Sequence, residues 1–124
     1  MDLKAINATL KTSTEIEIVH PVTGEGGWFI ELATPCHTAA QAKAAAVRDK
    51  MERRKHTATP AQEQRELAEL LCAFILGWRG LTSDGEEVPY SHETALQALG
   101  ESNAFWVRKQ ILDAIGDPVR PFNV

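Results

Sequence analysis

The stretch Leu67–Tyr90, LAELLCAFILGWRGLTSDGEEVPY, holds the longest dense apolar block of the chain, then a tryptophan and a turn built on Asp84-Gly85. Its apolar residues recur at the spacing of one α-helical face, at Leu67, Leu70, Leu71, Phe74, Ile75 and Trp78. Other apolar residues between them cover the remaining sides, and a helix that is apolar on most sides must be buried on most sides. The pattern predicts a central helix that runs to about Trp78 and is ended by Gly77 and Gly80.

The composition is that of one globular domain. The chain has 124 residues, of which 44% are hydrophobic and 24% charged, so residues 1–124 can bury a core without a disulfide or a metal. Its net charge of −4 gives no electrostatic footprint for nucleic acid. Two cysteines do not suggest a secreted disulfide scaffold, and no apolar run has the length of a signal peptide or a membrane span. We therefore expect a cytoplasmic protein that contacts neither nucleic acid nor membrane.

Two short runs near the N-terminus alternate between polar and apolar residues. Ile16 and Ile18 alternate with glutamates in the first run, and Trp28, Ile30 and Leu32 share one side of the second. These runs predict an antiparallel hairpin over residues 14–33. Because a two-stranded hairpin is marginal in water, it needs a helix on its apolar face or further strands, for which another subunit is one source.

Helix start signals follow the hairpin. Thr38 with Gln41, and Thr59 with Gln62, fit capping boxes for a helix over residues 39–56 and for the central helix. Ser91 can cap a helix from His92 to Leu99, after a small hairpin about Asp84-Gly85. A last helix, capped by Ser102 or Asn103, runs to about Ile115 with an expected inward face of Val107, Ile111, Ala114 and Ile115.

The expected fold class is α+β and mainly α-helical. It comprises an N-terminal β-hairpin at 14–33, a body of about four helices at 38–116 and a C-terminal tail at 117–124. Residues 1–13 have loose helical spacing and predict a short helix or an ordered arm. Phe122 in the tail is apolar enough to fold back onto the body.

Candidate metal ligands and nucleophiles lack the spacing that their chemistry needs. Cys36 and His37 are adjacent, whereas His56 and Cys72 lie far along the chain, and no CxxC or HxxxH pair exists. The acidic turn at Asp84 lacks the alternating ligands of a calcium loop, and no glycine-rich phosphate-binding motif is present. We predict no catalytic, cofactor-binding or metal-binding residues, no cofactor and no enzymatic activity.

One basic cluster lies in the helix predicted over residues 39–56, at Arg48, Lys50, Arg53, Arg54, Lys55 and His56. It has two interpretations. The cations could contact nucleic acid or an acidic partner, or they could stabilise a helix C-terminus and pair with nearby carboxylates. The acidic net charge and the absence of interleaved aromatic residues favour the second interpretation.

Two sets of residues are candidates for partner binding. The first is a stripe of small and apolar residues on the helix predicted at 39–56, made of Ala40, Ala44, Val47 and Met51. This stripe could form a groove for a partner helix, or it could be buried within the monomer, and the sequence leaves both open. The second is Phe105-Trp106 at the start of the last helix, because adjacent residues cannot both face inward and one is left for a partner.

The order of these segments resembles the tail assembly chaperones of long-tailed, non-contractile bacteriophages. The resemblance covers most of the chain: a strand ending in HPVTGE (residues 20–25), a second strand WFIEL (28–32), a helix ending in ERRK (52–55) and the segment ILGWRG (75–80). The acidic turn DGE (84–86), the segment VPYS (88–91) before a helix, and the closing IGD (115–117) complete it. The Gly-Trp-x-Gly segment followed by Asp-Gly-Glu and a small capped helix is its most specific part.

The resemblance implies a non-catalytic function. Such chaperones bind the long, aggregation-prone tape measure protein, keep it soluble and help to recruit tail tube protein, in many phages through a longer frameshifted product. They act in the host cytoplasm during assembly and are absent from the mature virion. A homo-oligomer would suit a protein that coats a long partner. The alternative is another small phage structural or adaptor protein, such as a head–tail completion factor, and a third class is a small nucleic-acid-binding regulator.

Overall fold

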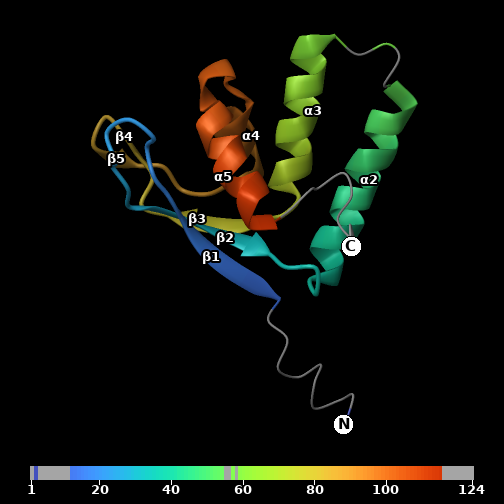
Figure 1. The fold of residues 1–124 in the computed structure, drawn as a ribbon, viewed down its shortest axis with the longest axis horizontal. Helices are drawn as coiled ribbons and strands as arrows, with labels where there is room; N and C mark the ends of the chain where they lie inside the picture. Colours follow the sequence, from blue (N-terminus) through green and yellow to red (C-terminus); the bar gives the residue numbers. More distant parts are fainter. Residues whose placement is uncertain (1, 3–11, 55–56, 58, 116–124) are drawn as a thin grey trace.

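The computed structural model describes residues 2, 12–54, 57 and 59–115. In this part of the chain a three-stranded antiparallel sheet is covered on one face by helices α3, α4 and α5, and helix α2 stands on the far side of α3 (Figure 1). The α+β, mainly helical fold class is confirmed. The predicted N-terminal helix or arm and the predicted contact of Phe122 lie outside the described residues.

Strands β1 (Ser13–Ile18) and β2 (Trp28–Ala33) form the predicted hairpin. They pair antiparallel with Ile16 opposite Ile30 and Ile18 opposite Trp28. Side chains alternate across the sheet as the sequence pattern requires. Ile18, Ile30 and Leu32 are buried against the helices, and Glu15, Glu17 and Glu31 are exposed on the other face.

The prediction of a helix that continues to Trp78 was wrong. Helix α3 (Pro60–Cys72) ends six residues earlier, and strand β3 (Ile75–Arg79) pairs antiparallel with β2, with Trp78 opposite Ile30. A short apolar run does not distinguish a buried strand from a buried helix by its period. Here the β-branched Ile75, the aromatic Trp78 and the helix-weakening Gly77 suit a strand. The strand supplies the third member of the sheet from the same chain.

The ends of β2 and β3 approach one another at two glycines with positive φ. Gly80 has φ +84°, and a Cβ at this position would run into the backbone carbonyl of Gly27, which has φ +99° itself. Gly80 therefore allows a close backbone contact with Gly27. The prediction that Gly80 ends a helix was wrong.

The helix caps follow the sequence in two cases and depart from it in a third. Thr59 and Gln62 cap α3, and Ser91 caps α4 (His92–Gly100), both through reciprocal capping boxes. Helix α2 (Thr38–Arg54) instead begins after His37, whose Nδ1 accepts a hydrogen bond of 3.1 Å from the Ala40 N–H. An imidazole nitrogen thus takes the place that was expected for the Thr38 hydroxyl.

The remaining predicted elements are present with small changes. Strands β4 (Thr82–Ser83) and β5 (Glu86–Glu87) flank the turn at Asp84-Gly85, where both residues have positive φ, as in a type I′ hairpin turn. A 3₁₀ turn, Ser102–Ala104, precedes α5 (Phe105–Ile115). The prediction that Ala114 faces inward on α5 was wrong. Ala114 is exposed, because the side of α5 that faces the core is the one with Val107 and Ile111.

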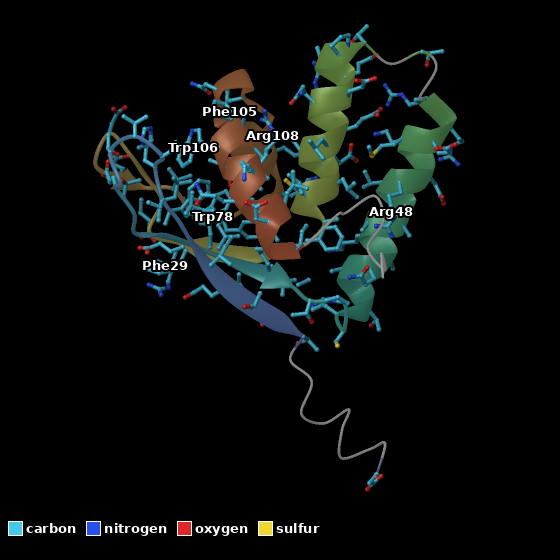
Figure 2. All side chains as sticks on the ribbon, viewed as in Figure 1. Phe29, Arg48, Trp78, Phe105, Trp106 and Arg108 are labelled. Carbon is cyan, nitrogen blue, oxygen red and sulfur yellow. The ribbon has the colours of Figure 1, made fainter. Side chains whose placement is uncertain are left out.

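The main core lies between the sheet and helices α3, α4 and α5. Trp78 lies at its edge between sheet and helices (Figure 2), with its ring in edge-on contact with Trp28 at 5.5 Å and Tyr90 at 5.1 Å. The buried Arg108 of α5 joins the helices. Its guanidinium donates to the carbonyls of Leu99 and Glu101 at 2.6 and 2.8 Å, where a helix C-terminus favours a cation.

Replacing Gly80 by alanine should destabilise the fold by roughly 3 kcal/mol, because strain at positive φ adds to a backbone clash with Gly27. Gly85→Ala is the matched control. Gly85 has φ +80°, but a Cβ added there would meet no atom within 4 Å, so this variant should lose only about 1 kcal/mol. Urea unfolding of both variants measures the difference, and equal losses would contradict the close approach of the two strands.

Candidate functional site

A surface trough runs along α3 between α2 and α4. Glu69, half-buried in the last turn of α3, lines three adjoining hollows with volumes of about 400, 400 and 200 Å³. Because α2 and α4 pack on opposite sides of α3 (Figure 1), the outward side of α3 forms the floor and the two helices form the walls. Helix α3 has 13 residues, so the trough extends over roughly 20 Å.

The sheet end of the trough is mostly apolar, with Lys43 and Glu69 as its charged residues. Helix α2 contributes Ala46 and Val47, the floor contributes Cys72 and Ala73, and Tyr90 stands at the end. Burial raises the pKa of the Cys72 thiol to about 12, with a smaller contribution from the Glu69 carboxylate. Burial likewise raises the pKa of Tyr90 above its usual value. Both groups are therefore neutral at physiological pH.

Two ion pairs join the α2 wall to the floor of the trough. Lys50 lies 3.4 Å from Glu69, and Arg54 lies 3.2 Å from the Oε1 of the buried Glu66. The Glu66 contact lacks the alignment of a hydrogen bond and is an ion pair only. The trough thus combines an apolar sheet end with charged residues along α3, and an amphipathic helix has both an apolar stripe and charged flanks to match them.

The predicted stripe on α2 divides between the core and the trough. Ala40 and Ala44 are buried, and Ala44 packs against Leu70 and Phe74 in a small second core. Val47 and Met51 are half-buried beside that core, and Val47 alone of the four lines the trough. The sequence interpretation in which the stripe is buried within the monomer therefore holds for the two alanines.

The trough contains residues that the sequence analysis did not select. Lys43, Ala46, Glu69 and Tyr90 converge on it from two helices and a loop. No local signal marks them, because an exposed alanine on a helix and a tyrosine in a loop are ordinary surface residues. Only the packing of α2 and α4 on α3 brings them together.

In the Phe105-Trp106 pair one residue is exposed and the other is half-buried, as predicted from their adjacency. Phe105 is 64% exposed, whereas Trp106 is half-buried with its ring 5.1 Å from that of His20 (Figure 2). The other described large apolar side chains that are exposed, Val19 and Val22, flank His20 in sequence. Phe105 thus remains available to a partner at the start of α5, away from α2.

Part of the basic cluster is paired within the molecule, and Arg53 is exposed. Lys50 and Arg54 form the ion pairs described above, and Arg48 is half-buried. Lys55 and His56 lie outside the described residues. These contacts favour the interpretation in which the cations stabilise α2 and its packing on α3.

Metal ligation and membrane spanning find no support in the part of the chain that the structure describes. Its residues contain no group of three or more His, Cys, Asp or Glu side chains that could hold a metal ion. Cys36 is exposed and Cys72 is buried, and neither forms a disulfide. No helix in the described part is long and apolar enough to cross a membrane.

Residues 33–113 match the model of a family described as YdaY prophage protein. The chain belongs to this family. The match covers more than half of the chain and identifies a phage-derived protein, which confirms the phage origin that the sequence resemblance implied. No curated protein and no solved structure matches the chain. All of the residues that line the trough lie inside the matched segment, whereas strand β1 lies outside it.

A thiol reagent should distinguish the exposed cysteine from the one in the trough floor. Because the thiolate is the reactive form, Cys72 with its pKa raised to about 12 should resist an aromatic disulfide reagent at pH 8, whereas Cys36 should react. The expected result is one thiol titrated per native chain and two after unfolding. The variant Cys36→Ser should titrate none in the native state, and rapid native labelling of that variant would contradict the burial of Cys72.

Proposed function

We propose that the chain is a phage tail assembly chaperone that holds a helical segment of the tape measure protein in the trough between α2 and α4. The observation that carries the proposal is this trough, a channel with helical walls and an apolar sheet end, in a member of a prophage protein family. A trough of roughly 20 Å accommodates between three and four turns of a partner helix. The role is non-catalytic.

The shape and chemistry of the trough suit a reversible partner. Its sheet end offers Val47, Ala73 and the neutral Cys72 and Tyr90 to an apolar stripe on the partner. Lys43 on the α2 wall and Glu69 and Arg65 on the floor can pair with charges of either sign beside that stripe. A contact over one helix face is small, and small interfaces are typical of transient complexes. A chaperone that must release the tape measure protein before the tail is complete needs such a contact.

The proposal includes the surroundings in which the chain would act. Binding would take place in the host cytoplasm during assembly, with the chain absent from the finished virion. Many copies would coat one tape measure chain, and a longer frameshifted product would recruit the tail tube protein. Phe105, exposed at the start of α5, supplies an apolar anchor for contacts between copies or with the tube protein.

Ala46→Glu tests the trough directly. Ala46 is exposed and lines the trough, so a glutamate there should leave the fold intact while it places a charge in the path of the partner helix. Ala45→Glu is the matched control, because Ala45 is also exposed on α2 but does not line the trough. Each variant is co-expressed with the tape measure protein of the same prophage, and the soluble complex is recovered through a tag on the chaperone.

The expected result is that the wild-type chain and Ala45→Glu keep the tape measure protein soluble and that Ala46→Glu does not. Equal recovery with both variants would show that the trough does not bind the partner. If the tape measure protein aggregates even with the wild-type chain, the chaperone function itself fails. Mass spectrometry of purified particles then tests for the alternative, since a completion factor stays in the virion.

A further inference from the structure

Strand β1 has a free outer edge. The strand order is β1-β2-β3, and among the described residues no strand pairs with β1 on its other side (Figure 1). At the opposite edge of the sheet, the segment after β5 contacts β3 at two points. The Trp78 indole donates to the Val88 carbonyl at 2.9 Å, and the Tyr90 hydroxyl donates to the Ile75 carbonyl at 3.1 Å. The sheet can therefore be extended on the β1 side.

The hydrogen-bond pattern shows which backbone groups are free. The Thr34 N–H donates to the Thr12 carbonyl at 2.9 Å, which places the even-numbered residues of this strand in hydrogen-bonded pairs with β2. The odd-numbered residues Ser13, Glu15 and Glu17 consequently direct their N–H and C=O groups outward. An edge of this kind is a template for a further strand.

The side chain of Gln110 closes one end of this edge. Its amide accepts from the Val19 N–H at 2.9 Å and donates to the Val19 carbonyl at 2.7 Å, the two bonds that a neighbouring strand would make. Val19 is the next outward-facing residue after Glu17. The helix α5 thereby occupies the edge at Val19 and leaves a free segment of defined length, from Ser13 to Glu17.

The charge beside this segment selects the partner. Glu15, Glu17 and Glu31 lie on the open face of the sheet, and the described cation facing them is Arg79, 3.0 Å from Glu15 and stacked over the Phe29 ring at 4.0 Å. The Glu17 carboxylate accepts a hydrogen bond of 2.9 Å from the Gly27 N–H, so among the described residues one cation faces three carboxylates and the face stays negative. Phe29 is on the side of the sheet away from the helices (Figure 2). On the inner face, the side chain of Ile16 is only half-buried at the edge. The free edge thus offers negative charge on one face and apolar surface on the other.

We propose that β1 binds an extended segment of a partner protein as a fourth strand, with Lys or Arg at the alternate positions that face Glu15 and Glu17 and apolar residues at the positions that face Ile16. Opposite charges across adjacent strands stabilise a sheet, and like charges destabilise it. A second copy of this chain is therefore a poor occupant, because pairing two β1 strands brings glutamates together. The site is separate from the trough and does not rest on the proposed function.

The probe is a fluorescein-labelled peptide of sequence Thr-Lys-Val-Lys-Val-Thr, compared with the same peptide carrying Glu for Lys. Fluorescence anisotropy with the full chain should give binding that is roughly tenfold tighter for the lysine peptide. Glu15→Lys should reduce this preference or invert it, with circular dichroism confirming that the variant is folded. In an extended peptide, alternate N–H groups point to opposite edges, and only one edge pairs with β1. N-methylation of the amides on that edge should abolish binding, whereas N-methylation of the amides on the other edge should not.

Amide exchange measured by NMR locates the contact. The Glu15 and Glu17 amide protons should become protected when the lysine peptide is added, and Ala46→Glu should bind it as the wild-type chain does. Equal binding of the two peptides, or indifference to N-methylation at both edges, would overturn the proposal. The proposal would also be overturned if the Glu15 and Glu17 amides became protected without peptide when the protein concentration is raised. That result would show that a second copy of the chain occupies the edge.

Discussion

The pairing of β3 with β2 positions most of the other elements. Helix α3 passes into β3 through only Ala73 and Phe74, and the Ala33 N–H donates to the Phe74 carbonyl at 2.7 Å. Helix α3 is therefore anchored at the sheet. After Gly80 the chain returns along β3 so that Tyr90 can bond the Ile75 carbonyl, and this return places the start of α4 beside α3. Without β3, the hairpin would have no third strand, and α3 and α4 would not be attached to the sheet.

The trough is a consequence of this arrangement. Helices α2 and α4 pack on α3 from opposite sides, and neither covers its outward face. The contact between α2 and α3 is small. Its buried part is Ala44 packed against Leu70 and Phe74, and two ion pairs join the same helices. Small residues in the core of this contact bring α2 close to α3, and the small, exposed Ala46 leaves the channel beside it open. The alanines of α2 thus have two effects. Ala44 allows close packing on α3, and Ala46 leaves the trough open to a partner.

Local signals in the sequence predicted much of the fold. The capping residues at Thr59 and Ser91, the alternation in β1 and β2, and the turn at Asp84-Gly85 act over a few residues, and each was confirmed. The switch from α3 to β3 could not be read in this way, because the helical spacing continues without a break through Ile75 and Trp78. What decides it is the bonding to β2, about 45 residues earlier in the chain, where local propensity yields to tertiary pairing.

The candidate site was predicted less well than the fold, for the same reason. The sequence left open whether the stripe on α2 forms a groove or is buried, and of its four residues only Val47 lines the trough. It identified Phe105-Trp106 as a pair with one exposed member, but the contact with His20 decides that Trp106 is the sheltered residue. Lys43, Ala46 and Tyr90 meet only in the folded chain. A groove between helices depends on how they pack, and single-residue patterns carry little of that information.

Hydrogen–deuterium exchange of the chain, alone and in complex with the co-expressed tape measure protein, tests the role of the trough most directly. We expect slower exchange in the complex along the trough, in α2 near Val47 and along α3 near Glu69, with the exposed β4–β5 hairpin unchanged as an internal reference. A complex that forms with protection elsewhere and none along α2 and α3 would contradict the assignment of the trough as the partner-binding surface.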